Sequence, residues 1–142
     1  ILSAIGRAQL RKAESFYRKR KKIAEQFTKA FKESRFFTVP PDGEGNAWHL
    51  CIVRLVPETL SIGRDDFARA LQEQGLGISM HFIPHFAFTF LKERYNLRAE
   101  DFPNAAARYA QSLSLPFWPD MSEDDIQYVI DTVIRTAERF RR

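Results

Sequence analysis

Cysteine is almost absent from this sequence, because Cys51 is the single one among 142 residues. One cysteine excludes a disulfide framework and a zinc site built on several cysteines. Long apolar runs are also missing, whereas a membrane-spanning helix needs about 20 consecutive, mostly apolar residues. No stretch has the pattern of a signal peptide. We therefore expect a cytoplasmic protein that does not bind a membrane.

Residues suited to catalysis are scarce as well, since histidine occurs three times. His81 and His85 are four residues apart, but Pro84 breaks the helix that would place both on one face, so we expect no metal site. His49 and Cys51 fall in an apolar strand pattern, where we expect a hydrogen-bonded core histidine and an inert thiol. The sequence contains no glycine-rich phosphate loop and no Ser-His-Asp arrangement.

His81 and His85 differ from His49 because they lie where a strand pattern ends and a proline-fixed turn begins. Strand ends and loops are where ligand contacts concentrate. Two interpretations remain open from the residues alone. The imidazoles either contact a ligand or pack among the nearby aromatic residues Phe82, Phe86 and Phe88.

The excess of positive over negative charge is confined to one segment. Residues 1–35 hold eleven of the 22 Lys and Arg but three of the 18 Asp and Glu, so the rest of the chain is acidic. Such a segment suggests a basic module that binds nucleic acid or another acidic partner. However, the five consecutive cations from Arg18 to Lys22 must point in all directions around a helix. A solvated helix is the more ordinary interpretation, and we expect no nucleic-acid binding.

Apolar spacing and turn residues predict the order of the elements. In the first half we expect one long helix over 1–34, a turn at Pro40-Pro41-Asp42-Gly43 and a strand over about 47–56. A helix from about Asp65 that Gly75 closes, a strand over 77–82 and a short helix ending at 95–96 should follow. The last part should contain a helix over 104–111, an extended segment over 112–115, and a final helix that starts at a capping box of Ser122 and Asp125.

Helices that bracket a few short strands, without regular strand-helix alternation, indicate the α+β class. With no repeats and no low-complexity linkers, we expect residues 1–142 to form a single domain. A chain of this length can bury a proper core without a disulfide or a structural metal.

Three segments together resemble one family. Residues 3–10, S-A-I-G-R-A-Q-L, are similar to the "A-A-x-G-x-x-Q-L" helix of the DegT/DnrJ/StrS group of fold-type I, pyridoxal-phosphate (PLP)-dependent sugar aminotransferases. Residues 75–84, G-L-G-I-S-M-H-F-I-P, resemble "G-I-x-T-S-V-H-F-I-P". Residues 101–105 and 112–122 resemble "D-F-P-N-A … S-L-P-L-x-P-x-M-T". The order and spacing agree along nearly the whole chain.

The resemblance implies a small C-terminal domain with a long N-terminal helix and a short, mainly antiparallel sheet covered by helices. The "S-x-x-K … G-E-G-G" motif of the PLP-binding large domain does not occur here. We therefore expect that this chain alone is inactive and holds no catalytic or cofactor-binding residue. The complete enzyme is implied to be a homodimer that uses PLP to transfer an amino group, typically from glutamate, to a nucleotide-linked keto-sugar.

The resemblance also implies that the turn of His81, Phe82 and Pro84 faces the substrate. Family members commonly read "H-F-I-P-L-H", with a second histidine two residues after the proline. This chain has His85 one residue after Pro84 and Phe86 at the usual histidine position. Either His85 substitutes through an altered turn, or the substrate takes an apolar contact with Phe86. All five residues are candidate substrate contacts.

Overall fold

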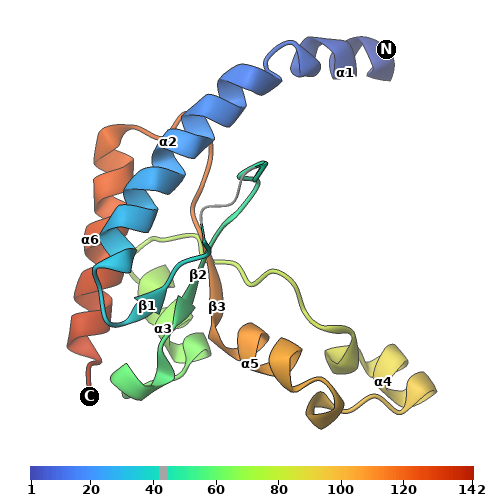
Figure 1. The fold of residues 1–142 in the computed structure, drawn as a ribbon, viewed down its shortest axis with the longest axis vertical. Coiled ribbons are helices and arrows are strands. Elements are labelled where there is room, and N and C mark those ends of the chain that lie inside the picture. The colour runs from blue at the N-terminus through green and yellow to red at the C-terminus, as the bar shows by residue number, and fades with distance from the viewer. Residues whose placement is uncertain (42–44) are drawn as a thin grey trace.

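The body of the protein is a small antiparallel sheet with helices packed against it, and a long arm leaves this body (Figure 1). The computed structural model describes residues 1–41 and 45–142, so the turn expected at Asp42-Gly43 lies outside the described residues. The elements run in the order α1 (Leu2–Leu10), α2 (Ala13–Lys32), β1 (Phe37–Thr38), β2 (Cys51–Leu55), α3 (Arg64–Gln72), α4 (Thr89–Tyr95), α5 (Pro103–Gln111), β3 (Ser112–Leu115) and α6 (Glu123–Arg139).

The sheet has the order β1-β2-β3 with antiparallel neighbours, which confirms the α+β class and the antiparallel sheet. Phe37 of β1 lies opposite Leu55 of β2, and Cys51 of β2 lies opposite Leu115 of β3. The alternation along β2 buries Cys51, Val53 and Leu55 and leaves the residues between them half-buried. One face of the sheet is therefore the core face.

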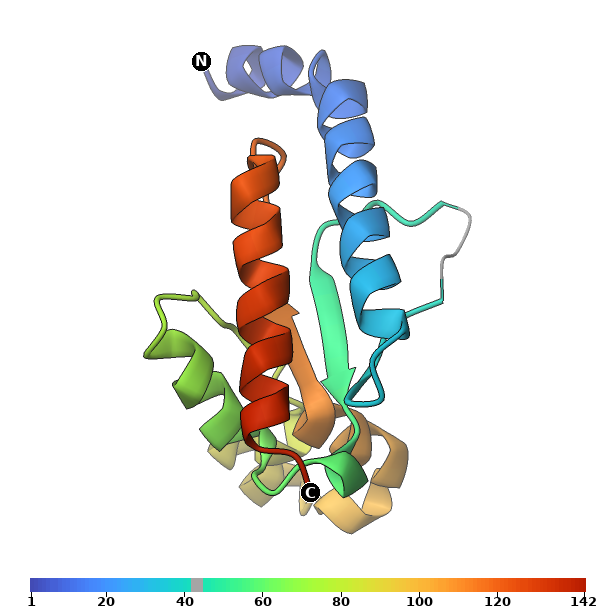
Figure 2. The same ribbon diagram turned by 90° about the vertical axis from the view of Figure 1, so that its left-hand side faces the viewer.

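α2 and α6 lie side by side over the core face (Figure 2). Ile23, Phe27 and Phe31 recur at the helical period along α2 and are buried. α6 contributes a parallel apolar stripe made of Ile126, Val129, Ile130, Val133 and Ala137. α3 closes the side next to α6. Aromatic rings join the layers, since the ring centres of Phe31 and Phe37 are 5.3 Å apart.

Local capping explains where several helices start and stop. At the start of α6, Ser122 Oγ accepts from the backbone N–H of Asp125 at 3.1 Å, and the Asp125 carboxylate accepts from the Ser122 N–H at 2.9 Å. This is the expected capping box. Gly75 has φ +81°, and the Leu76 N–H donates to the Leu71 carbonyl, as in the motif that ends helices at a left-handed glycine. The predicted start of α6 at Ser122 and the predicted end of α3 at Gly75 are confirmed.

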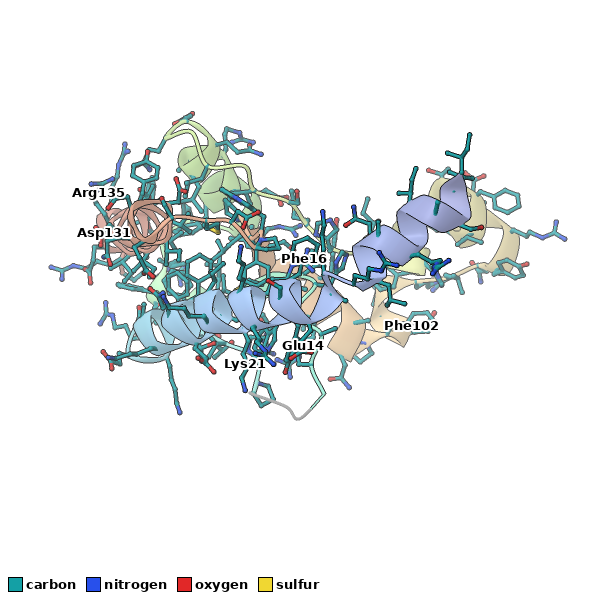
Figure 3. All side chains as sticks on the ribbon, turned by 90° about the horizontal axis from the view of Figure 1, so that it is seen from above. Glu14, Phe16, Lys21, Phe102, Asp131 and Arg135 are labelled. Atoms are coloured by element: carbon teal, nitrogen blue, oxygen red, sulfur yellow. The ribbon has the colours of Figure 1, made fainter. Side chains whose placement is uncertain are left out.

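The single helix expected over 1–34 was wrong, because the chain bends at Arg11 and Lys12 into α1 and α2 (Figure 1). The physical reason lies in the apolar stripe. Phe16 is half-buried and begins the stripe of α2 (Figure 3), whereas no residue of α1 is buried. Among the described residues, no buried side chain of α1 holds this helix in line with α2.

Two expected strands also differ. The strand over 47–56 shortens to Cys51–Leu55, because Trp48 adopts a left-handed backbone at φ 48° and its N–H donates to Asn46 Oδ1 at 2.9 Å. His49 is consequently exposed and is not the core residue we expected. Residues 77–82 form no strand and keep a single bridge, between Ser79 and Ser114. The two-residue strand β1 was not predicted.

The arm, residues 80–111, connects the Ser79 bridge to β3. It contains α4, α5 and two short 3₁₀ turns, His85–Ala87 and Ala99–Asp101, and it extends away from the sheet (Figure 1). Many of its apolar side chains are exposed: Phe82, Ile83, Phe88, Phe90, Tyr95 and Phe102. In the described part of the chain, no helix is long and apolar enough to cross a bilayer.

Candidate functional site

His81 opens the arm and is held by a residue of the sheet. Its Nδ1 is hydrogen-bonded to Ser114 Oγ at 2.9 Å, and Ser114 is buried. The backbones of Ser79 and Ser114 also exchange two hydrogen bonds, of 3.2 and 2.8 Å. The sheet therefore fixes both the chain before His81 and one nitrogen of its ring. Nε2 is the ring nitrogen left for another partner.

Phe82 follows His81 and points into open space. Its side chain is 75% exposed, and its ring centre lies 4.8 Å from the His81 ring at an angle of 67°. The peptide bond between the two residues is cis. Pro84 is half-buried and His85 is exposed. His81 therefore packs against an aromatic neighbour, Phe82, as the second interpretation of the imidazoles expects.

Phe86 has a different surrounding. Its ring stacks on Phe102, with centres 5.9 Å apart and planes inclined by 15°. Phe102, labelled in Figure 3, comes after α4 in the sequence and belongs to the D-F-P-N-A segment. One face of the Phe86 ring is therefore taken by packing within the arm, while His85 next to it remains free of that stack.

The sequence did not indicate Ser114 or Phe102 as neighbours of the turn from His81 to Phe86. Ser114 is 33 residues from His81, and Phe102 is 16 residues from Phe86. Pairings at such separations depend on the path of the chain and leave no local pattern. The resemblance did mark both segments, since each belongs to one of the quoted motifs.

Arg64 attaches the returning end of the arm to the body. Its side chain is 8% exposed, and Nη1 donates to the carbonyls of Tyr109 at 3.1 Å and Ser112 at 3.4 Å. The guanidinium also lies over the Tyr109 ring, 4.7 Å from its centre. Nε is 2.6 Å from Asp65 Oδ1 but is not aligned to donate to it. Arg64 thus provides donors for the last carbonyls of α5.

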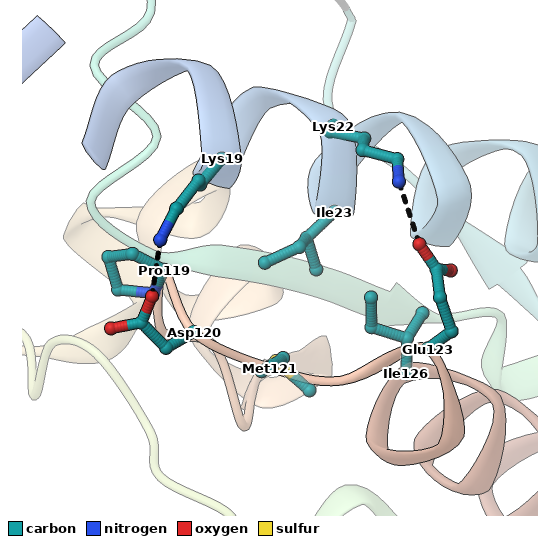
Figure 4. Close-up of a pocket in the computed structure, with 8 residues that line it drawn as sticks. All are labelled: Lys19, Lys22, Ile23, Pro119, Asp120, Met121, Glu123 and Ile126. Carbon is teal, nitrogen blue, oxygen red and sulfur yellow. Dashed lines mark hydrogen bonds and ion pairs between the residues drawn. The ribbon is translucent and has the colours of Figure 1, made fainter. Parts of the chain in front are cut away.

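The cation run on α2 is largely neutralised. Lys19 Nζ lies 2.6 Å from Asp120 Oδ1 and Lys22 Nζ lies 2.7 Å from Glu123 Oε1, on both sides of a pocket between α2 and the start of α6 (Figure 4). The hydrogen bonds from Lys22 and Gln26 lower the pKa of Glu123. Within α2, Arg18 pairs with Glu14 at 2.8 Å and Lys21 with Glu25 at 3.9 Å.

Cys51 is not a nucleophile in this structure. It is buried in β2, and burial raises the pKa of its thiol to about 12. A thiol with that pKa carries almost no thiolate at neutral pH. Among residues 1–41 and 45–142, no three His, Cys, Asp or Glu side chains are placed to hold a metal ion.

The lysines do not fit a covalent PLP site. A lysine that forms a Schiff base is activated by desolvation or by a neighbouring cation in a pocket. All seven lysines of this chain are exposed: Lys12, Lys19, Lys21, Lys22, Lys29, Lys32 and Lys92. The described residues therefore supply no anchor for the cofactor.

Solved structures share this fold over almost the whole chain. PseC of Helicobacter pylori, an aminotransferase involved in pseudoaminic acid biosynthesis, superposes with a TM-score of 0.86 at 23% identity, covering 97% of this chain and 37% of that one. DesV of S. venezuelae, solved with a ketimine intermediate, gives 0.84 at 24% identity, covering 96% and 36%. Spr1654 of Streptococcus pneumoniae, described as a "putative sugar aminotransferase" and solved in PLP and PMP forms, gives 0.84 at 23% identity, covering 94% of this chain and 34% of that one.

Sequence relatives agree with the fold. The spore coat polysaccharide biosynthesis protein SpsC of Bacillus subtilis is 31% identical over 136 residues, which are 94% of this chain and 35% of SpsC. MJ1066 of Methanocaldococcus jannaschii is 33% identical over 143 residues, 99% of this chain and 37% of that protein. The chain thus spans about a third of these relatives.

The sequence model of one family covers residues 1–134. Its description names aminotransferases, and solved relatives exist in PLP and PMP forms, so the family uses PLP. The fold, the quoted motifs and this match agree. The chain belongs to the DegT/DnrJ/EryC1/StrS aminotransferase family.

Proposed function

We propose that this chain works as the C-terminal small domain of a PLP-dependent sugar aminotransferase. The observation that carries the proposal is the combination of coverage and chemistry. The chain matches relatives over 94–99% of its own length but about a third of theirs, and none of its lysines is suited to hold PLP. The remaining part of the enzyme supplies the cofactor lysine.

The complete enzyme, in this proposal, moves an amino group from glutamate to a keto-sugar linked to a nucleotide, in the cytoplasm and as a homodimer. PLP supplies the electron sink for that chemistry when it is bound. The roles of the similar proteins SpsC, in spore coat polysaccharide biosynthesis, and PseC, in pseudoaminic acid biosynthesis, support a sugar substrate.

The small domain contributes substrate contacts from His81, Phe82, Pro84, His85 and Phe86. Ser114 holds Nδ1 of His81, which leaves Nε2 as a polar contact for a sugar hydroxyl or carbonyl. The exposed Phe82 ring provides apolar surface that excludes water from the reacting carbon. Because Phe86 stacks on Phe102, it contacts the substrate through its ring edge or its second face.

The paired cations argue against a basic module for nucleic acid. Four of the five side chains from Arg18 to Lys22 already contact carboxylates. A phosphate backbone would have to replace those partners before any counterion release could stabilise the complex. A steep salt-dependent association of this chain with duplex DNA or RNA, lost when Arg18 to Lys22 are neutralised, would contradict our proposal.

The decisive experiment compares this chain with the product of the complete reading frame that contains it. We expect the complete product to give a borohydride-reducible PLP adduct and to aminate nucleotide-linked keto-sugars with glutamate. The 142-residue chain should give neither. A specific PLP adduct on a lysine of this chain would contradict the proposal.

Two variants of the complete product then test the site. H81A should raise KM for the sugar and leave the cofactor absorbance unchanged. H49A is the matched control, because His49 also lies outside the helices and strands but is not part of the arm. Equal effects of H81A and H49A would remove His81 from the substrate site.

A further inference from the structure

Arg20 stands apart from the other cations of α2. Its four neighbours in the run from Arg18 to Lys22 each contact a carboxylate, whereas no acid lies within 4 Å of Arg20 in residues 1–41 and 45–142. Its Nε is buried and has no hydrogen-bond partner there. Buried donors in folded proteins are nearly always paired, so the Arg20 Nε lacks the expected partner among the described residues.

Arg20 also lines a pocket. The pocket has a volume of about 500 Å³ and lies in the bend between α1 and α2, and we call it the elbow groove. Its lining consists of Gly6, Gln9, Leu10, Ala13, Phe16, Tyr17, Arg20 and Ala47. Most of this lining is apolar. The pocket therefore suits a group that brings apolar surface together with one negative charge.

The face of α1 next to the elbow groove is uncovered. Ile1 is 102% exposed, Leu2 84% and Leu10 75%, and α1 buries no residue. A helix of nine residues is not stable in water by itself and depends on packing. The elbow groove and α1 therefore form one continuous surface that requires a cover.

We propose that the elbow groove receives a polypeptide segment carrying an Asp or Glu, whose carboxylate pairs with Arg20. The segment belongs to the part of the enzyme outside this chain, so the inference rests on the proposed function. A free anion such as phosphate would neutralise Arg20 but leave α1, about 13 Å long at 1.5 Å per residue, without an apolar cover. A polypeptide surface satisfies both. The planar carboxylate also matches the guanidinium fork.

The test uses R20M in this chain and in the product of the complete reading frame. R18M is the matched control, because Arg18 lies two residues away, is exposed and pairs with Glu14 within α2. In this chain R20M should leave the thermal midpoint unchanged or raise it, since the variant removes an unpaired buried donor. In the complete product R20M should increase amide hydrogen exchange in residues 2–10 about tenfold, while R18M changes neither protein.

Three results would overturn the inference. A fall in the thermal midpoint of this chain with R20M, absent when D42N and E44Q are also present, would place the partner within residues 42–44. Protection of residues 2–10 that grows with the concentration of the isolated chain would identify a second copy as the cover. Unchanged exchange in the complete R20M product would show that Arg20 anchors nothing.

These outcomes are separate from failure of the proposed function. A complete product without a PLP adduct contradicts the aminotransferase proposal whatever Arg20 does. A complete product with PLP and full activity, but with no effect of R20M on exchange, contradicts the elbow-groove inference alone.

Discussion

Ser114 Oγ lies 2.9 Å from Nδ1 of His81, so a buried serine of β3 orients the first imidazole of the arm. The hydroxyl and the ring come from segments 33 residues apart that meet at the Ser79 bridge. Because Ser114 holds Nδ1, Nε2 is the ring nitrogen left for another partner. Ser114 is therefore a positioning residue for the proposed sugar contact.

S114A should loosen His81 without unfolding the domain. We expect KM for the sugar in the complete enzyme to rise about 3–10-fold, the usual value of one hydrogen bond, with kcat less affected. In this chain, the ¹⁵N signals of the His81 ring should move toward a mixture of tautomers. S112A is the control, because Ser112 Oγ donates to the Arg108 carbonyl instead. Unchanged ring signals in S114A would refute the positioning role.

R64M should detach the end of α5 from the body. Arg64 is nearly buried, and it donates to two carbonyls and covers the Tyr109 ring. We expect a loss of about 2–3 kcal/mol in the free energy of unfolding. Urea denaturation measures it.

R69M serves as the comparison for R64M, because Arg69 is exposed and its contact with Asp66 at 2.7 Å lies on the helix surface. It should cost less than about 0.5 kcal/mol. Equal losses for the two variants would show that Arg64 acts as an ordinary surface cation.

The thiol of Cys51 should resist modification while the protein is folded. Because burial raises its pKa to about 12, native protein at pH 8.5 should react with a disulfide reagent far more slowly than urea-unfolded protein. The neutral thiol favours the folded state below pH 9. This contribution should decline as pH rises from 9 toward 12, while unfolded chains ionise. Rapid labelling of native protein would contradict the buried position.

The capping box at α6 should make stability sensitive to acid. Hydrogen bonds from the Ser122 side chain and backbone lower the pKa of Asp125, so its charged form stabilises the folded state at neutral pH. D125N should therefore lower the thermal midpoint at pH 7, and the difference from the unmodified chain should shrink as pH falls through the lowered pKa.

S122A removes the same capping box from its other side and should cost about 1 kcal/mol at pH 7. D124N is the control for both variants, because Asp124 is in the same helical turn but outside the box. A D125N difference that stays constant down to pH 2 would exclude this carboxylate as the source of acid sensitivity.

Signals that act within a few residues were readable from the sequence. The Ser122 capping box and the glycine end at Gly75 each involve close neighbours in the sequence, and each was predicted. The bend at Arg11 was not, because it depends on where the body stops supplying contacts. The left-handed Trp48 likewise depends on a turn made with Asn46, which shortened the expected strand.

The candidate site divides in the same way. The motif marked the turn of His81 to Phe86, for which we propose a substrate role, whereas the residues that support this turn, Ser114 and Phe102, come from distant segments that meet through the fold. The exposure of His49 also follows from the path of the chain around Trp48. The apolar strand pattern around His49 had suggested a buried histidine there.

The Ser79–Ser114 bridge has a consequence for how such enzymes diversify. Ser79 and Ser114, which flank the arm, are joined by reciprocal backbone hydrogen bonds. The chain therefore leaves the sheet and returns to it at neighbouring positions. Changes in its length or sequence need not alter the register between β2 and β3. In the proposed function, changes in the arm would therefore alter substrate preference while the sheet stays the same, much as binding loops vary on other rigid sheets.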